Sequence, residues 1–133
     1  MDAPNILIVE DDANFRRVLE FRLNEAGYRT TVAENGEKAL ELFSKHRYRI
    51  VLTDLNMPGV GGEEVLKQVK KASSETPVII ITAFGSIDSA VEAMKLGAFH
   101  YLTKPVNSDE LIHVINNALK YSKGRAANPL RHE

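Results

Sequence analysis

The sequence predicts an α/β protein built on a doubly wound, five-stranded parallel sheet with helices on both faces, which makes a three-layer sandwich. Two observations lead to this prediction. Short apolar runs rich in β-branched residues alternate five times with segments in which apolar residues recur at helical spacing. The connections between them are short, and strand–helix alternation of this kind is typical of parallel sheets with right-handed crossovers.

The five predicted strands are residues 6–9, 28–33, 50–53, 77–82 and 99–103. The runs 6–9 and 50–53 are continuously apolar, as expected for strands that are covered on both faces. The segment 28–33 alternates only weakly, so we expect it at an edge of the sheet. The segment 77–82 is the most apolar, so we expect it at or next to the centre.

A predicted helix with one apolar face follows each strand. Gly27 and Gly97 are natural C-terminal stops for the first and fourth helices, and Ser86 and Asn107 are natural N-caps for the fourth and fifth. The apolar faces comprise, helix by helix, Phe15, Val18, Leu19, Leu23 and Ala26; Ala39, Leu40 and Phe43; Val65, Leu66 and Val69; Ile87, Ala90, Val91 and Met94; and Leu111, Ile112, Ile115, Ala118 and Leu119.

Composition excludes several classes of function. A net charge of −1 gives no electrostatic reason to expect direct binding of nucleic acid or of an anionic membrane. The chain has no cysteine, which excludes disulfides, thiolate nucleophiles and Cys-based metal sites and suits a reducing cytoplasm. No apolar run approaches the roughly 20 residues of a membrane span, and the acidic N-terminus does not resemble a signal peptide.

The 133 residues are expected to form one domain, residues 5–121. From residue 122 the composition becomes small, polar and basic. We expect residues 122–133 to be a flexible tail, the start of a linker or a remnant of cloning.

Four of the five strands end in polar residues with chemical potential. In a parallel sheet these ends share one edge, where ligands bind, and the strand order 2-1-3-4-5 makes the first and third strands neighbours. The residues are Glu10, Asp11 and Asp12 after the first strand, Asp54 after the third, Thr82 after the fourth and Lys104 after the fifth.

Clustered carboxylates repel one another, and a hard divalent cation resolves the conflict. Magnesium prefers oxygen ligands and is commonly held by one or two carboxylates together with a phosphate. The cluster therefore predicts a Mg²⁺ site that receives a phosphoryl group, with Asp54 as its nucleophile. Lys104 can offset charge on the phosphoryl oxygens, and the Thr82 hydroxyl can donate a hydrogen bond to one of them.

These motifs resemble the receiver domains of bacterial two-component response regulators. The resemblance covers residues 5–120 and rests on Glu10-Asp11-Asp12, on Asp54 in the run Asp54-Leu55-Asn56-Met57-Pro58-Gly59, on Thr82-Ala83 and on Lys104-Pro105. It implies a flavodoxin-like (βα)5 fold. It also implies that Asp54 accepts a phosphoryl group from a phosphohistidine of a sensor histidine kinase or from small phosphodonors.

The resemblance also implies roles for the other residues at the sheet edge. Glu10 and Asp11 match the family's acidic pair, with Asp11 as the preferred direct Mg²⁺ ligand, while Asp12 is a third acid that is included among the candidate metal residues without an exact role. Asp54 and the backbone carbonyl of Asn56 would complete the metal site.

The switch residues follow from the same resemblance. Thr82 would be the switch hydroxyl, Tyr101 the switch aromatic and Lys104 the phosphate partner. The bond between Lys104 and Pro105 is usually cis in this family.

Residues 82–98 are similar to receivers of the nitrogen-regulation class. Those receivers usually precede an ATPase that activates transcription and a DNA-binding domain, neither of which is present in this chain. The resemblance implies control of such an output, and a possible homodimer, through the surface of the fourth helix, fifth strand and fifth helix. It implies a cytoplasmic protein that catalyses only its own phosphorylation and dephosphorylation.

Other interpretations start from the same residues. Asp54 alone is more often a cap or turn residue, acids 10–12 can cap the first helix, and Tyr101 can be a core aromatic. A hydrolase with an aspartyl-phosphate intermediate needs a second acid at position 56, which is Asn. A flavin-binding module needs hydroxyl-rich phosphate loops after the first strand, where this chain has acids. A degenerate receiver that serves only as a docking module is the remaining alternative.

Overall fold

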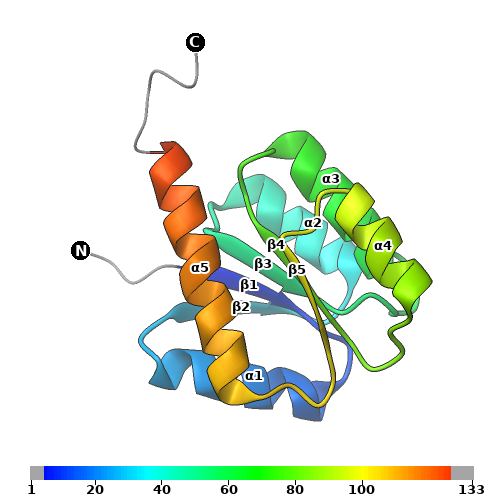
Figure 1. Ribbon diagram of the computed structural model, residues 1–133, viewed down its shortest axis with the longest axis horizontal. Helices are drawn as coiled ribbons and strands as arrows, with labels where there is room; N and C mark the ends of the chain where they lie inside the picture. Colours follow the sequence, from blue (N-terminus) through cyan, green and yellow to red (C-terminus); the bar gives the residue numbers. More distant parts are fainter. Residues whose placement is uncertain (1–4, 127–133) are drawn as a thin grey trace.

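The computed structural model describes residues 5–126, in which five parallel strands form one sheet in the order β2-β1-β3-β4-β5. This order and its parallel pairing confirm the predicted doubly wound fold (Figure 1). β2, the weakly alternating strand, lies at one edge, and β4 is next to the central strand. The strands are β1 (Asn5–Val9), β2 (Arg29–Ala33), β3 (Ile50–Thr53), β4 (Val78–Thr82) and β5 (His100–Thr103).

Two layers of helices cover the sheet, because successive side chains of each strand point to opposite faces. Ile8 and Leu52 pack in one buried cluster with residues of α1 and α5. Leu7 and Val51 pack in the other, with residues of α2, α3 and α4. The helices are α1 (Ala13–Glu25), α2 (Gly36–Lys45), α3 (Gly62–Ala72), α4 (Ile87–Lys95) and α5 (Ser108–Ala126).

Local sequence signals fix where several helices begin and end. Ser86 and Ser89 form a reciprocal capping box at the start of α4. Gly27 and Gly97 have φ values of 97° and 103°, a left-handed conformation that terminates α1 and α4 as predicted. None of the helices within residues 5–126 is long and apolar enough to cross a membrane.

The predicted apolar faces of α1 and α4 are partly wrong. Val18 and Ala26 are exposed, and so are Ile87, Val91 and Met94, the main apolar residues of α4. Ala93 is the buried residue of α4. The cause is geometric: α4 lies beside the edge strand β5, so it buries only a narrow stripe and leaves its larger side chains outside (Figure 1).

The predicted boundary at residue 122 is not where the last helix ends. α5 continues to Ala126, because a glycine such as Gly124 weakens a helix by only about 1 kcal/mol and does not stop it. The rest of the predicted tail, residues 127–133, and the N-terminal residues 1–4 lie outside the described residues.

Candidate functional site

Backbone hydrogen bonds continue the sheet by one residue beyond three of its strands, and each of these residues is one of the predicted site residues. The Glu10 N–H donates to the carbonyl of Ala33 at 3.0 Å. The Asp54 N–H donates to the carbonyl of Val9 at 3.0 Å, and the Lys104 N–H donates to the carbonyl of Thr82 at 2.9 Å. The positions of these side chains are therefore set by the rigid sheet and not by mobile loops.

Three carboxylates meet at this edge. Within residues 5–126, Glu10, Asp11 and Asp54 each offer a carboxylate oxygen, and these atoms all lie within 4.8 Å of one another. Glu10 is 1% exposed and Asp54 is 7% exposed, whereas Asp11 faces solvent. A surface pocket of about 490 Å³ lined by Asp11, Glu34 and Glu37 among others opens beside the cluster. The site combines two buried acids with one that is reached from outside.

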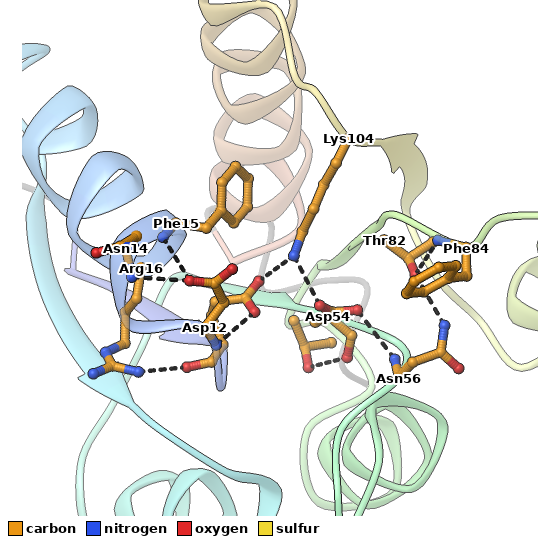
Figure 2. Close-up of polar contacts among 11 residues, drawn as sticks. Asp12, Asn14, Phe15, Arg16, Asp54, Asn56, Thr82, Phe84 and Lys104 are labelled. Carbon is orange, nitrogen blue, oxygen red and sulfur yellow. Dashed lines mark hydrogen bonds and ion pairs between the residues drawn. The ribbon is translucent and has the colours of Figure 1, made fainter.

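Lys104 neutralises part of this charge. Its Nζ lies 2.9 Å from Glu10 Oε1 and 3.0 Å from Asp54 Oδ2, and its side chain is 16% exposed. Figure 2 shows Lys104 reaching down from the end of β5 to the carboxylate of Asp54. The ammonium also lies 4.3 Å from the centroid of the Phe15 ring on α1.

The ionisation of this group follows from burial and charge. Burial raises the pKa of Glu10, and it outweighs the hydrogen bonds from the Asp12 backbone and Lys104, which lower it. Burial alone would lower the pKa of Lys104, but its hydrogen bonds to Glu10 and Asp54 outweigh this and raise it. Lys104 therefore carries its positive charge at neutral pH, next to the carboxylates.

Asp12 has a structural task. Its Oδ1 accepts hydrogen bonds from the backbone N–H groups of Asn14 at 2.9 Å and Phe15 at 3.2 Å, which caps α1. Its own N–H donates to Glu10 Oε2 at 3.0 Å. Asp12 is thus the helix cap that the sequence left open as an alternative, and it is not part of the group of three carboxylates.

Arg16 supports the same turn. Its Nη1 donates to the backbone carbonyl of Glu10 at 2.8 Å, so a side chain of α1 holds the turn between β1 and α1 from outside (Figure 2). The sequence analysis did not identify this residue. An Arg on a helix has no sequence signal that distinguishes such a contact from an ordinary solvated position.

Asn56 connects Asp54 with Thr82. The Asn56 backbone N–H donates to Asp54 Oδ1 at 3.1 Å, and its side-chain Nδ2 donates to Thr82 Oγ1 at 3.1 Å. The Phe84 N–H donates to the same hydroxyl oxygen at 3.3 Å (Figure 2). Thr82 is completely buried, and these two N–H groups hold its hydroxyl in place.

Tyr101 lies on β5, the strand next to β4, and is opposite Ile80, two residues before Thr82. It is half-buried, and its phenolic oxygen lies 2.6 Å from the Ser89 Oγ of α4. The peptide bond between Lys104 and Pro105 is cis, the geometry that the resemblance implies. The hydroxyl of Tyr101 therefore links the edge strand β5 to α4.

The loop after Asp54 is packed tightly against it. A Cβ at Gly62 would lie 2.0 Å from the Asp54 carbonyl oxygen, so only glycine allows α3 to start this close. The Thr53 hydroxyl donates to the same carbonyl at 2.9 Å. These contacts fix the Asp54 backbone independently of its side chain.

The arrangement fits a hard divalent cation. Its donors are all oxygens, and burial of Glu10 together with Asp54 leaves more negative charge than one ammonium offsets. Such a site can hold a metal between the acids and still leave the exposed side of Asp11 open.

The family model described as the response regulator receiver domain matches residues 6–116. The chain belongs to this family. The predicted resemblance is thereby confirmed, and the (βα)5 fold follows from it.

This receiver domain is similar to the receivers of several transcriptional regulators. The uncharacterized transcriptional regulatory protein YkoG of Bacillus subtilis (strain 168) is 41% identical over 120 residues, which cover 90% of this chain and 53% of YkoG. The DNA-binding transcriptional regulator NtrC of Escherichia coli (strain K12) is 40% identical over 116 residues, which cover 87% of this chain and 25% of NtrC. The chain thus spans about half of the first relative and a quarter of the second.

Solved structures agree with this assignment. A response regulator receiver domain protein from Clostridium thermocellum is 34% identical and superimposes with a TM-score of 0.86, covering 90% of this chain and 97% of that one. The match to NtrC confirms the predicted similarity to the nitrogen-regulation class.

Lys104→Met should destabilise the receiver domain in a pH-dependent way. Because the pKa of Glu10 is raised above its ordinary value of 4.5, folding favours its neutral form. This contribution is fully present below 4.5 and is lost as pH rises through the folded pKa. Loss of the ammonium raises the pKa of Glu10 further, so the variant loses more stability at the higher pH.

Urea unfolding in EDTA measures this effect. We expect a small loss at about pH 5 and a loss of about 1–3 kcal/mol at about pH 7.5. Lys67→Met, which removes an exposed lysine of α3, is the matched control and should lose little at either pH. An equal loss at both pH values for Lys104→Met would contradict the electrostatic account.

Proposed function

We propose that this receiver domain is a phosphoryl-accepting switch, in which Asp54 takes a phosphoryl group from a phosphohistidine of a sensor histidine kinase. The observation that supports this most strongly is the meeting of Glu10, Asp11 and Asp54 with the ammonium of Lys104 at the carboxyl edge of the sheet. An acid buried among other acids and opposite one cation is an activated acceptor and not merely a helix cap.

The chemical step is a displacement at phosphorus. A carboxylate oxygen of Asp54 attacks the phosphorus atom, and the bond from phosphorus to the donor breaks. The donor leaves with the electron pair, as a histidine imidazole that takes up a proton or as acetate when acetyl phosphate is used. The product is an acyl phosphate on Asp54, and Lys104 lies 3.0 Å from that carboxylate, within reach of the new phosphoryl oxygens.

Magnesium is the cofactor that we propose for this step. Asp11, Glu10 and Asp54 would hold it through their carboxylates, with the backbone carbonyl of Asn56 as a further ligand. When bound, it supplies positive charge that offsets the charge of the phosphoryl oxygens. The domain does not turn over an external substrate in this proposal: its residues only assist their own phosphorylation and dephosphorylation.

Thr82 and Tyr101 would transmit the change. Asn56 links the buried Thr82 hydroxyl to Asp54, because it donates hydrogen bonds to both side chains. A phosphoryl oxygen on Asp54 can attract the Thr82 hydroxyl by a hydrogen bond. A shift of Thr82 changes the space next to Tyr101, whose hydroxyl contacts Ser89 of α4. Phosphorylation then favours one of two conformations of α4, β5 and α5 over the other.

The surface of α4 supports a partner-binding role. Ile87, Val91 and Met94 of α4 are 82%, 48% and 48% exposed although they are apolar, and Phe84 in the loop before α4 is 81% exposed. We propose that this face, with β5 and α5, engages an output domain or a second receiver. The receiver covers a quarter of NtrC, a DNA-binding transcriptional regulator. A transcriptional output in the cytoplasm is therefore proposed, without direct contact of this domain with nucleic acid or a membrane.

Asp54→Asn should abolish phosphorylation by acetyl phosphate. The amide nitrogen and neutral oxygen of Asn cannot form the acyl phosphate, so intact-protein mass spectrometry should show no phosphoryl adduct. Wild type should gain one adduct with Mg²⁺ and none with EDTA.

Asp109→Asn is the matched control for this experiment, because Asp109 is exposed in the first turn of α5. It should be labelled like wild type. An adduct on the Asp54→Asn protein, mapped to another residue, would contradict the site. A folded wild type that binds partners but never gains an adduct would instead support the docking-module alternative.

Thr82→Ala should separate phosphorylation from switching. Asp54 of this variant should still be labelled, but the ring resonances of Tyr101 should no longer shift on phosphorylation in NMR spectra. Thr82→Ser keeps the hydroxyl and should preserve the shift. A Tyr101 response of wild-type size in Thr82→Ala would refute the coupling through Thr82.

A further inference from the structure

The ammonium of Lys104 is enclosed on three sides. Two of its N–H groups account for the contacts with Glu10 Oε1 at 2.9 Å and Asp54 Oδ2 at 3.0 Å. The Phe15 ring, whose centroid is 4.3 Å from Nζ, covers a third side. Figure 2 shows the ring beside the Lys104 side chain, at the start of α1.

The place of the Phe15 ring is fixed by the same turn that presents the acids. The Phe15 N–H donates to Asp12 Oδ1, and the Asp12 N–H donates a hydrogen bond to Glu10 Oε2. The ring is half-buried and packs against the cluster under α1 and α5. The backbone that carries the ring is therefore held by the α1 cap.

Core packing alone does not require an aromatic ring at this position. A core residue needs apolar bulk, which leucine also supplies, whereas a cation is attracted specifically to the face of an aromatic ring. The ring also keeps water from one side of the ammonium, which strengthens its attraction to the carboxylates.

We propose that Phe15 is a positioning residue for phosphoryl transfer. Its ring holds the Lys104 ammonium over Asp54, where the phosphoryl oxygens arrive, and keeps water from that side. This inference rests on the proposed phosphorylation of Asp54. It adds to that proposal a residue of α1 that would act through Lys104.

The experiment compares the full chain with Phe15→Leu, Phe15→Tyr and Phe15→Trp. Acetyl phosphate with Mg²⁺ is the donor, so that an effect cannot come from docking of a kinase. The initial rate of Asp54 labelling should fall by about fivefold in Phe15→Leu and should stay within about twofold of wild type in the two aromatic variants. Phe21→Leu, which alters an exposed phenylalanine on the same helix, should be labelled at the wild-type rate.

A second readout reports the contact directly. In NMR spectra of the wild type, the Hε protons of Lys104 should be shifted upfield by the ring current of Phe15. This shift should disappear in Phe15→Leu and remain in Phe15→Tyr, which a role in packing alone would not explain.

The results distinguish failure of the inference from failure of the proposed function. Wild-type labelling rates in folded Phe15→Leu, equal slowing in all three variants, or unshifted Lys104 protons in the wild type would each overturn the role of Phe15. An unlabelled wild type whose Lys104 protons are shifted upfield would overturn the proposed function, and with it the catalytic part of this inference.

Discussion

The ion pairs of Lys104 are the interaction on which the rest of this site depends. One ammonium holds Glu10 and Asp54, two buried carboxylates from different strands, at 2.9 and 3.0 Å. Without it, the two acids would face each other in a partly desolvated cleft, where like charges oppose joint ionisation. A buried ion pair is weak evidence for stability, because desolvation offsets much of its attraction. The arrangement is therefore better explained by the chemistry that it permits than by the stability that it adds.

The parallel sheet makes this charge arrangement possible. β1, β3 and β5 end at the same edge, and backbone hydrogen bonds from Glu10, Asp54 and Lys104 continue the ladder for one more residue. Each side chain is thus placed by a rigid element, and the chain needs no flexible lid to assemble the site. The part that we propose to change on phosphorylation lies elsewhere, in α4, whose larger apolar side chains are exposed and whose Ser89 contacts Tyr101 of β5.

Much of the site could be predicted because its signals are local. Each of Glu10, Asp54, Thr82 and Lys104 stands at the end of an apolar run, and the parallel order alone brings these ends together. The position of Phe15 over Lys104 could not be predicted, since an apolar residue on a helix face is also what a core position looks like. The same limit applies to α4, because helical periodicity identifies an apolar stripe but not whether the sheet is wide enough to cover it.

The central claim is that Asp54 receives a phosphoryl group between bound Mg²⁺ and Lys104. Its most direct test is a crystal structure of the chain with Mg²⁺ and beryllofluoride, a phosphoryl mimic. We expect beryllium bonded to an Asp54 oxygen, Mg²⁺ on Asp11 and Asp54, and fluorides within hydrogen-bond distance of Lys104 Nζ and Thr82 Oγ1. Beryllofluoride bound elsewhere, or absent at saturating concentration while Lys104 keeps both carboxylates, would contradict the account.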